Sequence, residues 1–166
     1  EIITMPASSA TYHSAVSQLT STGAPFEIID SVANGTAFKA YKNAAQSLLA
    51  VVNEGRQFDT APFVTYQGKT LSFADFFAQV DRLRSLLMVQ QQIQKGDKIA
   101  IAMRNCPEWM IAFVAILGCG AVAVPLNSWG REEELSQGLD DSEAKLVICD
   151  WPRYQFIEHK LPAISA

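Results

Sequence analysis

The chain has 166 residues, of which 49% are hydrophobic and 18% are charged, and this composition predicts a folded globular domain with a substantial core. The formal net charge of −4 argues against a nucleic-acid partner, because such a partner needs a broad basic surface. The longest apolar stretch, 109–124, is interrupted by Gly118 and Gly120, so we expect no membrane span.

Residues 1–60 are expected to form a lead-in of short elements. The hydrophobic pattern and its breakers predict a helix over 8–20, strands over 26–29 and 36–41, and a helix over 47–55. The pair Asn34-Gly35 between the two strands is a strong signal for a tight turn. Ser47 can cap the second helix, and Gly55 is expected to end it.

A hairpin and a long helix are predicted at the start of the second part of the chain, 61–166. The hairpin turns at Gln67-Gly68, and Ser72 and Asp75 have the spacing of a capping box that opens the helix. Apolar residues then recur every three or four positions, which is the period of a buried helical face. They are Phe76, Phe77, Val80, Leu83, Leu86 and Leu87.

Downstream, the pattern alternates between apolar strands and helices. Strands are expected at 98–103, 121–126 and 145–150, separated by helices at 108–118 and 131–141. Asn105 is expected to cap the first of these helices. Because short connections join the five elements, the predicted fold class is α/β, with a parallel βαβαβ sheet flanked by helices and a short hairpin region before it.

The spacing Gly118-x-Gly120-x-x-Ala123 matches a dinucleotide-binding turn, but its place in the pattern does not. Such a turn follows a strand and opens a helix, so that the N-terminus of the helix meets the pyrophosphate. Here the glycines follow a helix and precede a strand, where the helix presents C=O groups. We therefore predict that these residues end a helix and bind no nucleotide.

Few other residues indicate a site, and no catalytic or metal-binding residue is assigned. The sequence contains no GxxxxGK[ST], GxSxG or HExxH motif. Cys106, Cys119 and Cys149 are widely separated, which predicts packed thiols in a reducing, cytoplasmic compartment and neither disulfides nor a metal site. His13 and His159 are interpreted as surface or packing residues.

Two loops follow the carboxyl ends of predicted strands, where ligands gather in α/β proteins. Arg104 in the first loop is a candidate for contact with a phosphate. In the second loop Trp129 lies between Ser128 and Gly130, so we expect it to be exposed and to line a groove. Arg131, which follows in this loop, can contact an anionic ligand or can be an ordinary surface arginine.

Four segments occur in order along the chain: LSFADF (71–76), KGDKIAIAMRNCPEW (95–109), LGCGAVAVPLN (117–127) and EELSQGLDDSEAKLVICD (133–150). As an ordered set they resemble the start of the AMP-forming acyl-CoA synthetases, in the adenylate-forming superfamily. The upstream residues resemble the lead-in of bacterial fatty-acid ligases. By this resemblance, 61–166 is the first α/β subdomain of the AMP-binding (adenylation) domain, and thus part of the large N-terminal domain of such an enzyme.

The resemblance implies an enzyme that uses ATP and Mg²⁺ to convert a carboxylic acid, of the fatty-acid class, into an acyl-adenylate and then transfers the acyl group to coenzyme A. It also implies that Arg131 approaches the nucleotide end of coenzyme A. The family's Ser/Thr/Gly-rich phosphate loop and its mobile C-terminal lid are absent from this sequence. We therefore expect an N-terminal fragment that is inactive by itself and can dimerise through its exposed edges.

Two alternatives remain open at this point. One is an adenylating enzyme with a different acyl acceptor, which passes the acyl group to a carrier protein or oxidises it. The other is a non-catalytic α/β interaction module. The sequence motifs of this chain are structural, and they do not distinguish these alternatives from a coenzyme A ligase.

Overall fold

A computed structural model describes residues 9–161, which form two compact units divided between Gln46 and Ser47. This division lies before the expected boundary at residue 61. The intervening residues join the second unit because Val52 packs against its main core and the Arg56 guanidinium is bonded to the Asp81 carboxylate. The role of 1–60 as a functional lead-in stays a prediction.

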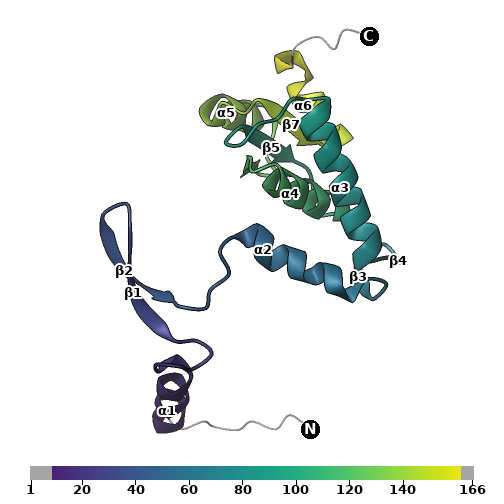
Figure 1. The fold of residues 1–166 in the computed structure, drawn as a ribbon. Coiled ribbons are helices and arrows are strands. Elements are labelled where there is room, and N and C mark those ends of the chain that lie inside the picture. Colours follow the sequence, from purple (N-terminus) through teal and green to yellow (C-terminus); the bar gives the residue numbers. More distant parts are fainter. Residues whose placement is uncertain (1–8, 162–166) are drawn as a thin grey trace. The chain divides into compact units, whose positions relative to one another are not determined.

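The described part of the first unit consists of a helix followed by a hairpin (Figure 1). Its elements are α1 (Ser9–Thr20), β1 (Ile28–Ala33) and β2 (Thr36–Tyr41), and the two strands pair antiparallel. Asn34 and Gly35 form the turn with φ of 51° and 80°, which confirms the predicted turn. The first strand begins two residues later than predicted, because Glu27 is buried and its carboxylate accepts from the Gly23 N–H and the Lys42 ammonium.

The second unit begins with a short helix and a hairpin that lead into a long helix. These elements are α2 (Leu48–Asn53), the 3₁₀ turn η1 (Glu54–Phe58), β3 (Pro62–Tyr66), β4 (Lys69–Ser72) and α3 (Phe73–Val89). The Ser47 hydroxyl caps α2, and Ser72 and Asp75 form the predicted capping box of α3. Gly55 does not end the helical segment as predicted, since the chain continues through it as η1.

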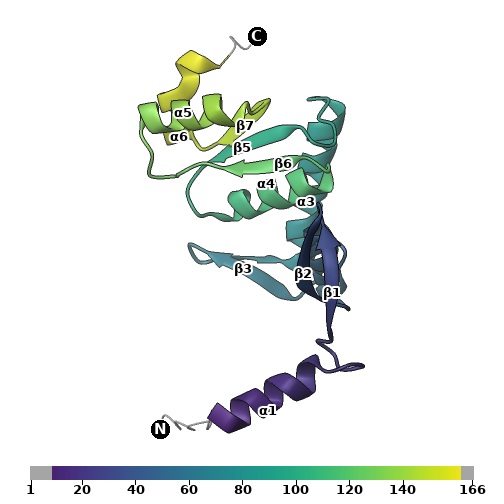
Figure 2. The same ribbon diagram turned by 90° about the vertical axis from the view of Figure 1, so that its left-hand side faces the viewer.

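A three-stranded parallel sheet follows, in the order β6-β5-β7 (Figure 2). The elements are β5 (Lys98–Ala102), α4 (Pro107–Gly118), β6 (Val122–Pro125), α5 (Glu132–Ser142), β7 (Leu146–Cys149), α6 (Trp151–Ile157) and the 3₁₀ turn η2 (Glu158–Lys160). This topology confirms the predicted βαβαβ sheet, while α6 was not predicted. Among the described residues no helix is both long and apolar enough to cross a membrane.

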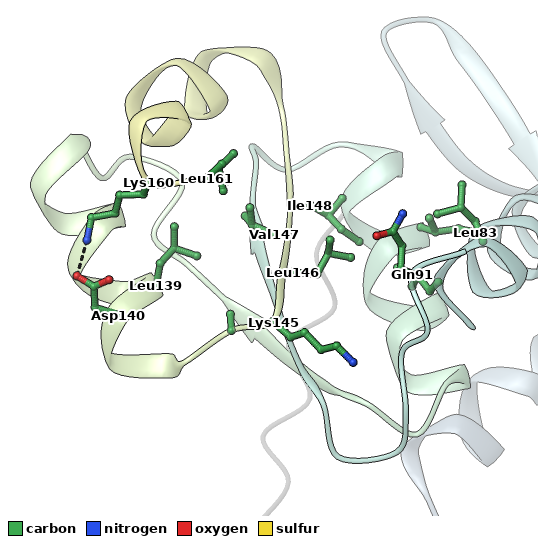
Figure 3. A pocket seen from close by; sticks show the side chains of 13 residues that line it. Leu83, Gln91, Leu139, Asp140, Lys145, Leu146, Val147, Ile148, Lys160 and Leu161 are labelled. Carbon is green, nitrogen blue, oxygen red and sulfur yellow. Dashed lines mark hydrogen bonds and ion pairs between the residues drawn. The ribbon is translucent and has the colours of Figure 1, made fainter. Parts of the chain in front are cut away.

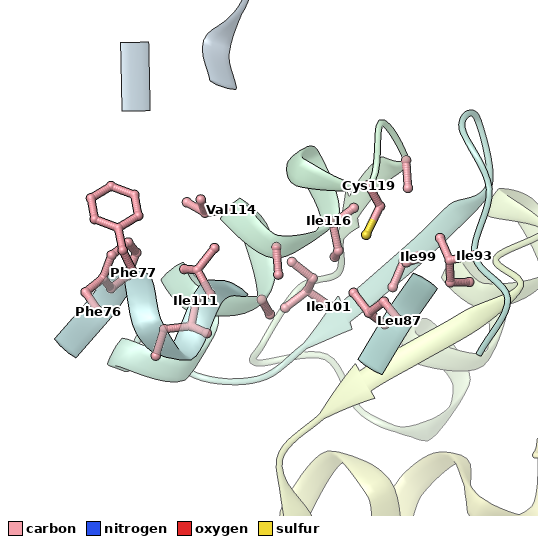
Figure 4. Close-up of a cluster of buried hydrophobic side chains, with 14 of the residues drawn as sticks. Phe76, Phe77, Leu87, Ile93, Ile99, Ile101, Ile111, Val114, Ile116 and Cys119 are labelled. Carbon is pink, nitrogen blue, oxygen red and sulfur yellow. The ribbon is translucent and has the colours of Figure 1, made fainter. Parts of the chain in front are cut away.

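Helices cover both faces of this sheet because side chains alternate along each strand. Ile99 and Ile101 of β5 belong to the main core, which α3 and α4 complete (Figure 4). Ala102, on the opposite face, packs with Leu135 of α5 and Ile157 of α6 in a second cluster. The α5–α6 layer and the α3–α4 layer therefore sandwich the sheet.

The buried face of α3 largely follows the predicted pattern. Phe76, Phe77, Val80 and Leu87 are buried, and Leu83 is partly buried against the same core. The exception is Leu86, which is 40% exposed and lines a surface groove instead of the core. The apolar stripe of a long helix winds slowly around the helix axis. In the last turns of α3, Leu86 therefore points beside the core and not into it.

The two glycines after α4 have the structural role that their position predicts. Gly118 is the last residue of α4, and Gly120 has φ of 68°, the left-handed conformation that ends a helix. The Gly120 N–H donates to the Leu117 carbonyl, and its carbonyl accepts from the Gly96 N–H. The N–H and C=O of Gly120 are thus hydrogen-bonded within the fold. They lie at the edge of the sheet opposite the carboxyl ends of the strands.

Candidate functional site

The carboxyl edge of the sheet brings together the loops that follow β5, β6 and β7. Parallel strands end at one edge, and side chains from these loops converge there. Residues 103–106 follow β5, residues 126–131 follow β6, and Asp150 alone separates β7 from α6. Asp150 and Arg153, which the sequence had not singled out, form hydrogen bonds that connect all three loops.

Asp150 connects the loop after β5 to the start of α6. Its carboxylate accepts from the backbone N–H of Arg104 at 3.1 Å and from the backbone N–H of Arg153 at 3.1 Å. The second contact is an N-cap, which is the usual role of an aspartate before a helix. The Arg153 guanidinium also donates to this carboxylate at 3.1 Å, so both oxygens of Asp150 are occupied.

Arg153 extends this network to the loop after β6. Its Nε donates to the carbonyl oxygen of Ser128 at 2.9 Å, and its Nη2 donates to the same oxygen. The side chain of Arg153 is only 12% exposed, so these bonds lie in a partly desolvated place where charge-assisted hydrogen bonds are strong. Arg153 thus fixes the main chain just before Trp129.

Asn127 shapes the rest of this loop from within. Its Oδ1 accepts from the N–H of Trp129 at 3.1 Å, and its Nδ2 donates to the Glu134 carboxylate at 2.7 Å. Gly130 closes the turn by donating to the Asn127 carbonyl at 2.9 Å. An added Cβ at Gly130 would lie 3.0 Å from that carbonyl oxygen, a tight contact that the glycine avoids.

Arg104 and Trp129 meet across the two loops. The Arg104 guanidinium lies over the Trp129 indole, 3.0 Å from the ring centroid. Trp129 is 77% exposed, which confirms the predicted exposure. The Nη1 of Arg104, in contrast, is buried, and it has no hydrogen-bond partner among the described residues.

Arg131 lies at the start of α5, at the same edge. Its backbone carbonyl accepts from the Leu135 N–H, and its side chain is exposed. Within residues 9–161 its guanidinium makes no hydrogen bond or ion pair, so its charge is available to an anion. The neighbouring Glu132 faces His159 at 3.8 Å, which places His159 at the surface as expected.

Asn105 does not cap α4, and this prediction was wrong. The N-cap is Cys106, because Pro107 occupies the first helical position and the residue before a proline is held in an extended conformation. Asn105 is exposed and contributes to a hollow of about 310 Å³ with Tyr66 and Trp109. Trp109 itself is partly buried and contacts the main core.

The cysteines do not form a reactive centre in the described part of the chain. All three thiols are free, and burial raises the pKa of Cys106, Cys119 and Cys149. They remain protonated near neutral pH, which fits the predicted packing role. The described residues also contain no group of three acidic, histidine or cysteine side chains that could hold a metal ion.

A larger groove lies along the free side of β7 (Figure 3). It has a volume of about 650 Å³ and a mostly apolar lining. Leu83 of α3 contributes from one side, Leu139 of α5 and Leu161 from the other, and β7 lies between them. The charges at its rim are paired, Lys160 with Asp140 and Lys145 with Asp97, so this groove offers no free charge to a ligand.

A family model described as AMP-binding enzyme matches residues 52–165, a range that includes the sheet and all of its carboxyl-edge loops. The chain is a member of the AMP-binding enzyme family. Its resemblance to adenylate-forming enzymes is thereby confirmed.

Curated relatives of this chain include coenzyme A ligases. The long-chain-fatty-acid–CoA ligase of Bacillus subtilis is 29% identical over 103 residues, which are 62% of this chain and 18% of that protein. The crotonobetaine/carnitine–CoA ligase of Citrobacter koseri is 30% identical over 92 residues, 54% of this chain and 18% of that protein. The chain thus spans less than a fifth of these relatives' length.

Two solved structures have a similar fold. Coronafacic acid ligase from Pectobacterium brasiliense, in a mutant form, has a TM-score of 0.64 and 25% identity, covering 68% of this chain and 22% of that chain. The N-terminal subdomain of Klebsiella oxytoca NpsA has a TM-score of 0.62 and 24% identity, covering 69% of this chain and 29% of that chain. The match to NpsA, at 24% identity, shows a similarity of fold alone.

Proposed function

We propose that this chain supplies the first α/β subdomain of an ATP-dependent acyl-CoA synthetase. The enzyme activates a carboxylic acid of the fatty-acid class as an acyl-adenylate, and it then forms a thioester with coenzyme A. The observation that carries the proposal is the family match over 52–165, together with relatives that are named CoA ligases. ATP, Mg²⁺ and coenzyme A are the cofactors of this reaction, and the free cysteines fit a cytoplasmic location.

The role of the chain in this enzyme is to hold loops at the carboxyl edge of the sheet. Asp150 and Arg153 fix the loop after β6 and the start of α6. The side chains carried by this loop are therefore held in a constant position relative to a bound ligand. We assign Arg131 to the nucleotide end of coenzyme A, because its exposed guanidinium is unpaired in the described structure and guanidinium binds phosphate. No catalytic residue is assigned to this chain.

We expect the isolated chain to be inactive. Formation of an acyl-adenylate requires donors that disperse charge on the phosphates in the transition state, and the second step requires a closing lid. The sequence contains no Ser/Thr/Gly-rich phosphate loop. A pyrophosphate-release assay of this chain with ATP and a series of fatty acids should therefore show no turnover.

The main test uses a protein of the family's full length that contains this chain. ATP–pyrophosphate exchange dependent on a fatty acid, followed by chromatographic detection of its coenzyme A thioester, is the expected result. Arg131→Ala should raise the apparent KM for coenzyme A and leave the exchange reaction unchanged, whereas Arg82→Ala, at an exposed position on α3, serves as the control. An unchanged KM would remove Arg131 from the proposal.

A second candidate is an adenylating enzyme with a carrier-protein acceptor. A structure of NpsA fused to ThdA, described as an adenylation–PCP di-domain, is 25% identical over 67% of this chain, with a TM-score of 0.61. Fatty-acid-dependent exchange without any thioester to coenzyme A, together with acyl transfer to a phosphopantetheinylated carrier protein, would favour this candidate over the first.

A further inference from the structure

The buried Nη1 of Arg104 is a hydrogen-bond donor without an acceptor in the described structure. Burying an N–H group of a guanidinium without a hydrogen-bond partner is unfavourable, because the group loses its hydration and gains no acceptor in return. Native structures rarely keep such a donor unless a group outside the structure accepts from it. The feature therefore indicates an acceptor that the chain itself does not provide.

The obvious acceptor within the fold is already occupied. Asp150 lies within bonding distance of the Arg104 backbone, but its carboxylate accepts from that backbone N–H and from the Arg153 guanidinium. The Ser128 carbonyl, the other acceptor in the network, also binds Arg153. Glu134 is bonded to Asn127. The Arg104 guanidinium is thus left without a carboxylate partner.

Trp129 contacts the face of this guanidinium and leaves the in-plane N–H groups unused. The indole is 77% exposed, so it is an outer cover that stacks on Arg104 and is not part of the core. The Trp129 side chain can move away from Arg104 at a small cost in free energy, because it buries little apolar surface in its present position. The N–H groups of Arg104 would then face the space between the two loops.

We propose that Arg104 is the anchor of an oxyanion-binding site between residues 103–106 and 126–131, and that Trp129 covers this site when it is empty. The ligand group is a phosphate or a carboxylate, because the planar fork of a guanidinium binds both through two parallel hydrogen bonds. Asp150 and Arg153 hold the two loops at the required spacing. This inference does not depend on the proposed enzymatic function.

The test is a titration of the chain with inorganic phosphate, pyrophosphate and acetate, followed by calorimetry and by tryptophan fluorescence. One saturable site per chain is expected, with a fluorescence change that disappears in Trp129→Phe, although Trp109 and Trp151 remain. Tighter binding of pyrophosphate than of acetate identifies a phosphorylated ligand, and the reverse order identifies a carboxylate.

The variants separate the Arg104 site from a general effect of surface charge. Arg104→Gln should abolish binding, and Arg104→Lys, which keeps the charge but loses the fork, should weaken it about tenfold. Arg82→Gln, at an exposed position on α3, is the control and should bind within about twofold of the wild type. Circular dichroism and a cooperative thermal transition establish that each variant is folded.

Two results would overturn the proposal. The first is the absence of saturable binding by the wild-type chain. The second is binding by Arg104→Lys or a folded Arg104→Gln that equals the wild type. Should Arg104→Gln fail to fold, the Arg104→Lys measurement decides the question alone.

Discussion

The Nε of Arg153 lies 2.9 Å from the carbonyl oxygen of Ser128, 25 positions earlier in the chain. This bond joins the first turn of α6 to the loop after β6. Because Arg153 also binds Asp150, which in turn accepts from the Arg104 N–H, three loops share one set of hydrogen bonds. Four predictions concern this network, the turn after α4, the opposite edge of the sheet and the groove beside β7.

Arg153→Ala should destabilise the second unit by about 1–3 kcal/mol, because it leaves Asp150 and the Ser128 carbonyl without their charged partner. Urea denaturation at neutral pH measures this change, and hydrogen exchange should accelerate in residues 127–131. Lys39→Ala is the control, since its pair with Asp30 is largely exposed and should contribute less than about 1 kcal/mol. Equal losses in the two variants would contradict the assigned role of Arg153.

Gly120→Ala should destabilise the fold by about 1–2 kcal/mol. Its φ of 68° is unfavourable for a residue with a side chain, and the added Cβ would lie 3.3 Å from the Lys95 side chain. Gly118→Ala, at the last helical position, is the matched comparison. Its Cβ would lie 2.9 Å from Cδ of Arg84, but this flexible side chain can shift, and alanine favours the helix, so its cost should be smaller. Denaturant midpoints that rank the two in the opposite order would refute this reading.

Asp97 should make stability depend on pH at the amino edge of the sheet. Hydrogen bonds from the Lys145 ammonium and from the Gln94 N–H lower the pKa of the Asp97 carboxyl. A lowered folded-state pKa stabilises the protein above the unfolded value of about 3.9, and this contribution is lost as pH falls through the folded pKa. The free energy of unfolding should therefore fall below about pH 4.

Asp97→Asn should reduce this acid dependence and have its largest cost near neutral pH. Urea denaturation between pH 2.5 and 7, in about half-unit steps, gives the curve for each protein. Asp30→Asn, which removes an exposed carboxylate, should leave the shape of the curve unchanged. Parallel curves for the wild type and Asp97→Asn would show that Asp97 is not the responsible group.

The chain should form a concentration-dependent dimer through the free side of β7. Among the described strands, β7 pairs only with β5. The adjacent groove is apolar and its rim charges are paired internally, so two copies can meet without unpaired like charges. Sedimentation at several concentrations measures the association. Leu86→Glu in the groove should favour the monomer, while Val89→Glu, on the same helix but outside the groove, should not. A monomer at all concentrations would exclude this interface.

Local signals in the sequence predicted most of the elements. The turns at Asn34-Gly35 and Gln67-Gly68 adopt positive φ, as their residue types favour, and the capping box at Ser72 opens α3. The two turns and the capping box each depend on a few residues that are adjacent in the sequence, so the types of those residues suffice to predict them. The alternation of apolar strands and helices likewise predicted the parallel sheet.

Predictions that depended on tertiary packing were less successful. Gly55 lies within η1, where an added Cβ would be 3.2 Å from the Phe73 ring and 3.3 Å from the Phe77 ring, so the glycine serves close packing and not termination. The N-cap of α4 is Cys106 and not the predicted Asn105, because Pro107 restricts the backbone of Cys106 to an extended conformation. Asp150-x-x-Arg153 after an apolar strand was a readable capping signal for α6, and it was overlooked. The bond from Arg153 to Ser128 joins distant segments and has no local signature.

The two clusters on either side of the sheet have no residue in common. Side chains of β5 and β7 alternate between them, with Leu146 and Ile148 in one and Val147 and Cys149 in the other. The α5–α6 layer is therefore a replaceable module. A related protein could donate this layer, together with the matching alternate strand positions, without any redesign of the α3–α4 layer beneath it.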